Sequence, residues 1–176
     1  MDHQPPRIRP MTLADCDRVS EIRVRGWRSA YRGLMPQPYL DALSVTADAE
    51  KRRARFRDDG HDGVVNLVAE RDGEIVGWAV HGPYRDGDIR TADAELYAIY
   101  VDPAHLGNGI GRALLETSVR QCAPSYARMF LWVLRENARA RRFYERAGFH
   151  ADGAEEPYEA GGVAVPEVRY LKAPLP

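Results

Sequence analysis

Apolar residues recur along the chain at two spacings, and each spacing predicts its own kind of element. Apolar residues at helical spacing, such as Val19, Ile22 and Trp27, indicate a helix. Short runs rich in branched and aromatic residues indicate strands. The predicted strands are 7–12, 63–70, 73–80, 95–101, 128–134 and 166–172, and the predicted helices are 13–34, 49–58, 109–122 and 137–149.

The order of these elements predicts the fold class. Asp72-Gly73 is a dipeptide typical of a tight hairpin, and it lies between the strands 63–70 and 73–80. Segment 81–93 predicts a loop, and helices separate the later strands. We therefore expect an α/β (α+β) fold, one domain over 1–176, with a mixed central sheet and helices on both faces.

The composition narrows the class of protein. The net charge is -1 and 44% of the residues are hydrophobic, which gives no indication of a nucleic-acid or membrane-surface partner. The basic run 51–57 fits either a solvated helix face or a phosphate-binding patch. Cys16 and Cys122 form no CxxC motif, and we expect a reduced, cytoplasmic protein.

The sequence shows no pattern typical of a metal site, a membrane span or a signal peptide. The five histidines, His3, His61, His81, His105 and His150, show no metal-binding spacing. No apolar run approaches the length of a membrane span, and the N-terminus lacks the apolar core of a signal peptide. We therefore expect no metal, no membrane segment and no signal peptide.

Three glycines, Gly107, Gly109 and Gly111, occupy the joint between the predicted strand 95–101 and the helix that follows it. A glycine loop that opens a helix presents free N–H groups at the positive end of the helix dipole, which favours a phosphate or pyrophosphate. The alternative is a tight turn. The loop has no P-loop lysine, and both GxGxxG frames fail, at Arg112 and at Leu114.

The segment YVDPAHLGNGIGRALLE resembles the acyl-CoA-binding motif of the GNAT superfamily of N-acyltransferases, and NARARRFYERAGF is similar to a second motif of that family. The two motifs lie between Glu95 and Phe149 in the family's order and spacing. The resemblance implies a strongly twisted sheet whose fourth and fifth strands splay apart around pantetheine. It also implies acetyl-CoA as the acyl donor. Where the family usually has Gln or Arg, this chain has Leu106, to which we assign no role.

The resemblance also carries site residues over to this chain. The expected cofactor-binding residues are Ile99, Val101, Gly107, Asn108, Gly109, Ile110, Gly111, Arg112 and Asn137. Asn137 has the alternative role of a helix N-cap. Tyr144 resembles the family's general acid, and its alternative is ordinary packing.

Glu95 is the candidate base, with a solvated strand-end acid as the alternative. Strand alternation predicts that Glu95, Tyr97, Ile99 and Val101 share one face. A water chain is the other candidate for the base.

The acceptor end is less specified. Trp27, Tyr31 and Tyr84 are candidates for its wall, with packing as the alternative for Trp27 and Tyr31. The leading interpretation is transfer of an acetyl group to a primary amine of a small molecule or peptide. A non-catalytic acyl-CoA-sensing module and an unrelated nucleotide-binding protein are the competitors. Many relatives pair as dimers, so a homodimer is an open expectation, as are the acceptor and the preferred acyl chain.

Overall fold

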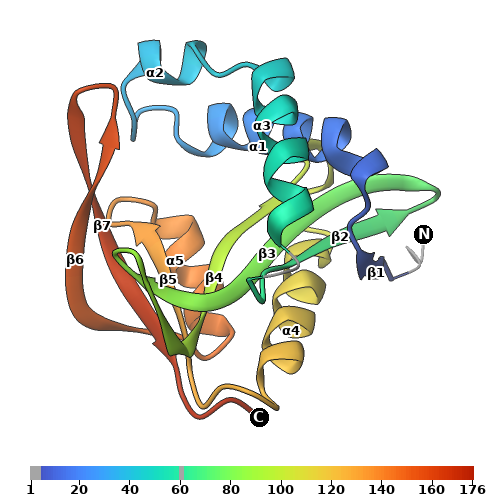
Figure 1. The fold of residues 1–176 in the computed structure, drawn as a ribbon. Coiled ribbons are helices and arrows are strands. Elements are labelled where there is room, and N and C mark those ends of the chain that lie inside the picture. Colours follow the sequence, from blue (N-terminus) through green and yellow to red (C-terminus); the bar gives the residue numbers. More distant parts are fainter. Residues whose placement is uncertain (1–4, 60–61) are drawn as a thin grey trace.

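The computed structural model describes residues 5–59 and 62–176, and its ribbon shows one twisted sheet between helices (Figure 1). Residues 1–4, which include His3, and residues 60–61, which include His61, lie outside the described residues. The strands are β1 Arg7–Pro10, β2 Val65–Arg71, β3 Glu74–Asp86, β4 Ile89–Val101, β5 Met129–Leu134, β6 His150–Ala160 and β7 Val163–Lys172. The helices are α1 Cys16–Ala30, α2 Gln37–Asp41, α3 Val45–Asp59, α4 Ile110–Cys122 and α5 Ala138–Arg146, with short 3-10 turns η1 Leu13–Asp15 and η2 Pro103–His105.

The strands pair in the order β1-β2-β3-β4-β5-β7-β6. Strands β4 and β5 run parallel, and the other neighbouring pairs are antiparallel. The parallel pair is joined through α4, which supplies the long crossover that a parallel connection needs. The predicted mixed sheet is confirmed.

The hairpin between β2 and β3 forms where the Asp-Gly pair predicts it. Asp72 and Gly73 both have positive φ, at 53° and 79°. Positive φ at both central residues is what the favoured two-residue hairpin turn requires.

The prediction of a loop over 81–93 is wrong, because β3 and β4 continue through it as paired strands and turn at Gly87. Pro83 pairs with Ala94, and the Ala94 N–H donates at 3.0 Å to the carbonyl of Arg128, on the β5 side. The Pro83–Ala94 pair therefore exchanges no hydrogen bonds, so the missing N–H of proline leaves the β3–β4 ladder intact.

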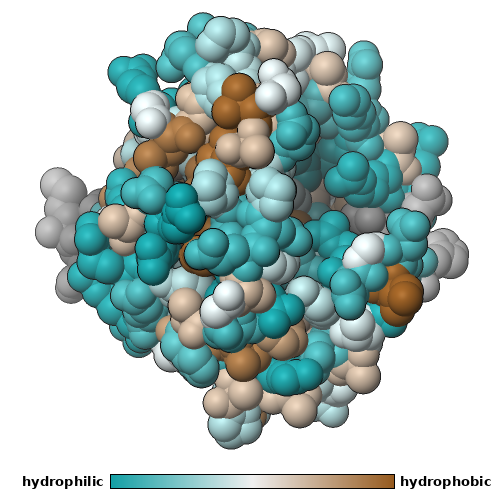
Figure 2. Space-filling model, turned by 90° about the vertical axis from the view of Figure 1, so that its left-hand side faces the viewer, coloured by the Kyte–Doolittle hydropathy of each residue, from teal (hydrophilic) through white to brown (hydrophobic). Residues whose placement is uncertain are grey.

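Strand β6 is an edge strand that the sequence pattern does not indicate. Its residues are nearly all exposed and include several acids, Gly153 and Pro157. Charges and proline on an edge protect it against pairing with other chains, and they also hide the alternation that marks a strand. The side of the molecule on which β6 lies faces the viewer in Figure 2. It is mainly hydrophilic, with hydrophobic residues gathered toward its top.

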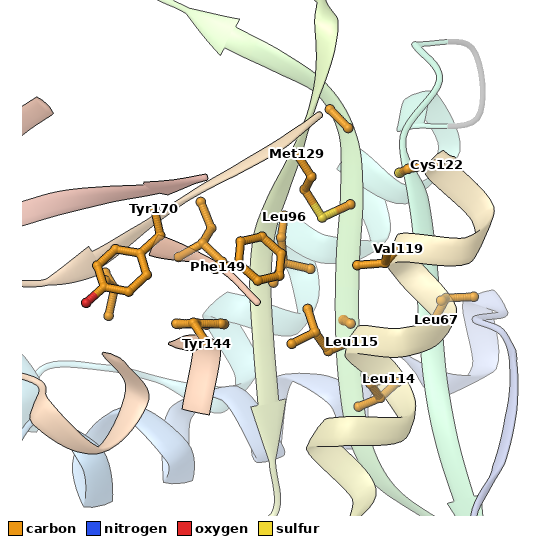
Figure 3. Packing of buried hydrophobic residues seen from close by; sticks show 14 of the residues in the cluster. Leu67, Leu96, Leu114, Leu115, Val119, Cys122, Met129, Tyr144, Phe149 and Tyr170 are labelled. Atoms are coloured by element: carbon orange, nitrogen blue, oxygen red, sulfur yellow. The ribbon is translucent and has the colours of Figure 1, made fainter. Parts of the chain in front are cut away.

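Each face of the sheet buries its own cluster of apolar side chains. On one face, α4 directs Leu114, Leu115, Val119 and Cys122 into the main core (Figure 3). Tyr144 joins the same core from α5. On the other face, residues of α1 pack against β2 and β3. The prediction of helices on both faces is confirmed, and Cys122 is a core residue as its helical spacing indicates.

Candidate active site

The site begins where β4 and β5 separate. They pair only from Ala94 to Leu96 on β4 and from Met129 to Leu131 on β5. Beyond that point β4 continues along β3, while β5 continues along β7 as far as Leu134. A cavity of about 1610 Å³ opens at this split, lined by residues of both strands. The predicted splay of the fourth and fifth strands is confirmed.

A β-bulge at Tyr97 changes which side chains face the cofactor side of β4. Val80 pairs with Ala98, and the next residue, His81, pairs with Leu96, so Tyr97 is the extra residue. The prediction that Glu95 and Tyr97 share a face with Ile99 and Val101 is therefore wrong. Ile99 and Val101 pack with Leu96 on the α4 face, and Tyr97 packs on the opposite face. A bulge shifts the alternation by one residue.

The backbone of β4 is open to the split at the two positions expected to bind pantetheine. The Asp102 N–H donates at 2.9 Å to the carbonyl of Val76 on β3. Because bonding alternates along an antiparallel pair, Tyr100 is the next residue directed to β3. The N–H and C=O groups of Ile99 and Val101 therefore point toward β5, which has already left the ladder.

The glycine loop forms a cradle at the N-terminus of α4. Gly107 and Gly109 have φ of 82° and 75°, and a Cβ added at either would meet nothing within 4 Å. Gly109 is the N-cap, and its carbonyl accepts the Ala113 N–H at 3.0 Å. The N–H groups of Ile110, Gly111 and Arg112 consequently have no partner from a preceding helical turn. Open space above free N–H groups at a helix N-terminus fits a pyrophosphate.

Asp102 anchors the entry to this loop. It is buried, and its Oδ1 accepts the Ala104 N–H at 3.0 Å, which caps η2. Its Oδ2 forms ion pairs with Arg18 and Arg25. Burial raises the pKa of Asp102, but the backbone hydrogen bond and the two arginines outweigh it and hold the pKa below the usual value. Asp102 thus stays charged and fixes the start of the loop.

Asn137 has the capping role that its sequence position predicts. Its Oδ1 accepts the Ala140 N–H at 3.2 Å at the start of α5, and Gly148 ends the helix region with φ of 87°. The residue also lines the cavity. With Oδ1 engaged, the amide Nδ2 is the group left for a cofactor, and that contact stays a prediction.

Tyr144 projects from α5 toward the split. Its ring packs near Phe143, Phe149 and Tyr170, while the residue lines the cavity. Burial raises the pKa of its hydroxyl, and the nearby Tyr100 adds to the effect. Within 5–59 and 62–176 the hydroxyl has no hydrogen-bond partner, so it is free to donate to a group in the cavity.

Glu95 lies at the cavity but is already bound. The Arg85 backbone N–H donates to its Oε2 at 3.0 Å, and the Arg85 Nη2 donates to Oε1 at 3.1 Å. The carboxylate side chain is 5% exposed. Sequence reasoning missed Arg85, because a segment read as a loop gives no register that would place it opposite β4.

The acceptor end of the cavity is only partly the one predicted. Trp27 and Tyr31 line it, and their rings meet edge to face at 4.9 Å. Tyr84 does not line the cavity. Its buried ring packs against that of Phe130, with the ring centroids 4.8 Å apart, and its hydroxyl accepts a hydrogen bond from Arg169 Nη1 at 3.0 Å.

Three further residues line the acceptor end and were missed by sequence reasoning. They are Glu156, Tyr158 and Glu167, which lie on β6 and β7. Their positions depend on the pairing of β6, for which the sequence carries no clear signal. Aromatic and acidic side chains therefore both line the acceptor end of the cavity.

Neither a metal centre nor a membrane span emerges from the described part of the chain. No group of three or more His, Cys, Asp or Glu there is placed to hold a metal ion. None of the helices described is both long and apolar enough to cross a membrane.

Comparisons with known proteins agree with this geometry. The acetyltransferase (GNAT) family model matches residues 25–149. The uncharacterized N-acetyltransferase YuaI of Bacillus subtilis (strain 168) is 30% identical over 162 residues, 92% of this chain and 89% of that protein.

Solved structures show the same fold. The ribosomal-protein-alanine N-acetyltransferase from Brucella melitensis is 25% identical, with a TM-score of 0.77 over 95% of this chain and 99% of that one. The PaiA N-acetyltransferase from Thermoplasma acidophilum, in complex with coenzyme A, has a TM-score of 0.73 at 21% identity over 97% of this chain and 99% of that one. The chain therefore belongs to the acetyltransferase (GNAT) family and is an N-acetyltransferase.

Proposed function

We propose that the chain transfers an acetyl group from acetyl-CoA to a primary amine of a small molecule or peptide, by direct attack of the amine. The observation that carries the proposal is the single cavity that joins the glycine cradle at α4, the open edge of β4 and the aromatic and acidic end near Trp27. A donor with a pyrophosphate, an amide-containing arm and a thioester fits these three parts in turn.

Different backbone groups of the chain would bind different parts of the donor. The N–H groups of Gly109 to Arg112 would hold the pyrophosphate, and Ile99 and Val101 would pair with the amides of pantetheine. Acetyl-CoA supplies the activated acetyl group as a thioester. The free edge of β4 also offers N–H groups to the oxygen that becomes negative during transfer.

Tyr144 is the proposed general acid, and Glu95 is the base that the sequence predicts. Tyr144 would protonate the departing sulfur, because its hydroxyl is free and lines the split between the strands. Glu95 lies at the same cavity and stays a predicted base, but its ion pair with Arg85 competes with that role.

We expect Tyr144→Phe to lower kcat by roughly 10-fold to 100-fold. This is at or below the lower end of the usual range for general acid–base catalysis, because a thiolate with a pKa near 8.5 is a tolerable leaving group. Affinity for CoA should stay within about twofold, since the change removes one hydroxyl. Stopped-flow thiol release and calorimetry measure the two quantities. A kcat equal to that of the wild type would remove Tyr144 from the mechanism.

A thiol-release screen tests the proposed function. The wild-type chain is incubated with acetyl-CoA and with amines, amino acids, aminoglycosides and peptides in turn. A peptide that begins with alanine is one choice, because the Brucella melitensis relative is described as a ribosomal-protein-alanine N-acetyltransferase. Acceptor-dependent thiol release with an acetylated product supports the proposal. CoA binding without release for any amine would favour the acyl-CoA-sensing module.

Three narrower expectations stay predictions. A cytoplasmic location is supported by Cys16 and Cys122, which are both free and buried. A homodimer is tested by light scattering. The preference for acetyl over longer chains is tested by repeating the screen with longer acyl-CoA donors.

A further inference from the structure

Two carboxylates face each other across the β6–β7 ladder. Glu156 on β6 pairs directly with Glu167 on β7, and both line the cavity. Like charges directly opposite each other in an antiparallel pair are destabilising. An arrangement that works against folding at a cavity wall indicates a need for negative charge at that place.

Glu167 has no cation paired with it, in contrast to Glu95, and it is half-buried, in contrast to the exposed Glu156. Among the residues that the structure describes, Glu167 has no ion-pair or hydrogen-bond partner for its carboxylate. The surrounding charged and titratable groups are Glu156 on β6, Glu95 and Tyr100 on β4, Tyr31 at the end of α1, and Arg135 after β5, which is itself bound to Glu136 and Glu155. Glu95, by contrast, is paired with Arg85.

The position of Glu167 places it beside the chemistry. It pairs with Leu134, the last residue of β5, beyond the point where β5 has left β4. Burial raises the pKa values of Tyr31 and Tyr100, and the charge of Glu167 raises both further. Tyr144 also raises the pKa of Tyr31. Glu167 and Tyr144 therefore share one chamber, with these tyrosines near both.

We propose that Glu167 receives the ammonium group of the acceptor and removes the proton that the amine must lose before it attacks. The substrate class is therefore a cationic primary amine whose neighbouring part is apolar or aromatic, because Trp27, Tyr31 and Tyr158 line the same end of the cavity. This inference rests on the proposed acetyl transfer and assigns the base to Glu167 instead of Glu95.

The proton balance closes with groups that are present. Glu167 takes one proton from the ammonium and later releases it to solvent. The nitrogen lone pair forms the new N–C bond, and the C–S bond breaks with its electron pair going to sulfur. Tyr144 gives that sulfur a proton and regains one from the second N–H of the attacking nitrogen through water. One amide, one thiol and one released proton result.

The protonation behaviour of Glu167 suits this role. Burial, together with the charges of Glu156 and Glu95, raises the pKa of Glu167 to about 7. A base whose pKa lies near the working pH is the most effective. Folding favours the protonated form of such a group, so its contribution to stability is lost as the pH rises from about 4.5 through about 7.

Carboxyl NMR of the full chain tests the charge state without any acceptor. The side-chain carboxyl resonance that disappears in Glu167→Gln should titrate near pH 7 in the wild type, and Glu156→Gln should lower that midpoint. Glu167→Gln should also unfold at a temperature no lower than the wild type at pH 8, since one of two facing charges is gone. A midpoint below about pH 5, near the usual glutamate value, would overturn the proposal.

Kinetics with the first amine that shows thiol release test the role. Glu167→Gln should lower kcat/KM by roughly 10²-fold to 10⁴-fold and remove the rise in rate through about pH 7. Glu159→Gln is the matched control: this exposed acid of β6 lies outside the cavity lining, and its change should leave rate and profile unaltered. Glu95→Gln should keep the pH-dependent rise.

The outcomes distinguish the role of Glu167 from the proposed acetyl transfer. Full activity and an unchanged pH profile in Glu167→Gln, or loss of the rise in Glu95→Gln, would overturn the role of Glu167 and leave acetyl transfer standing. Absence of thiol release from the wild type with every amine would instead contradict the proposed function itself.

Discussion

Gly109→Val is expected to weaken CoA binding by about 100-fold or more. Gly109 has φ of 75° at the N-cap of α4, and a β-branched residue is strongly disfavoured there. The loop must then change its path, which misdirects the N–H groups that follow it. Each hydrogen bond to a charged group is worth about 1.5–3 kcal/mol, so loss of two accounts for the effect. Calorimetry with CoA measures it.

A control for this prediction lies in the β6–β7 turn. Gly162 has φ of 88°, and like Gly109 it has open space where a Cβ would be. Gly162→Val imposes a similar backbone strain outside the cavity lining and should leave CoA affinity unchanged. Gly111→Ala should also be tolerated, because its Cβ would lie 3.5 Å from Phe143, an ordinary contact. Equal loss of affinity in Gly162→Val and Gly109→Val would show that the effect is one of folding.

Trp27→Ala is expected to lower the free energy of unfolding by about 3–5 kcal/mol, the usual result of truncating a buried tryptophan. Trp27 is 6% exposed and belongs to a core cluster with Met35, Leu40 and Leu134. Its ring also lies 5.7 Å from that of Tyr158. The change therefore removes packing between α1, α2 and β6 and collapses the acceptor end. Urea unfolding measures the loss.

A milder variant separates the two roles of Trp27. Trp27→Phe keeps an aromatic wall, and it should raise the acceptor KM while CoA affinity stays within about twofold. Tyr39→Phe is the stability control, because it removes only a 2.9 Å hydrogen bond to Tyr158, worth about 1 kcal/mol. If Trp27→Ala changed stability by less than about 1 kcal/mol, packing would not explain its burial.

Local signals in the sequence predict the elements that local physics fixes. The Asp72-Gly73 turn forms because two positive φ values suit those residues, and Asn137 and Gly148 bound α5 because their caps need no distant partner. The glycine cradle follows for the same reason, since its conformation depends on residues within one turn of Gly109.

The missed features depend on contacts between distant segments. The bulge at Tyr97 exists only in the register of β4 against β3, and it redirects Glu95 to Arg85. Strand β6 is acidic and exposed, so only its pairing with β7 reveals it. Glu167 becomes a candidate base through that pairing, which no pattern near residue 167 indicates. The glycine cradle and the positions of Trp27 and Tyr31 could therefore be predicted from the sequence, and the contribution of β6 and β7 to the cavity could not.

The central claim is that the split between β4 and β5, with the cradle at α4, binds the acyl donor. Amide NMR of the labelled chain during titration with CoA tests it most directly. The account predicts that the largest shift changes fall on Ile99, Val101 and the loop Gly107–Arg112, and that they vanish in Gly109→Val. Changes confined to other parts of the chain, such as the β6–β7 turn, with these amides unmoved, would contradict it.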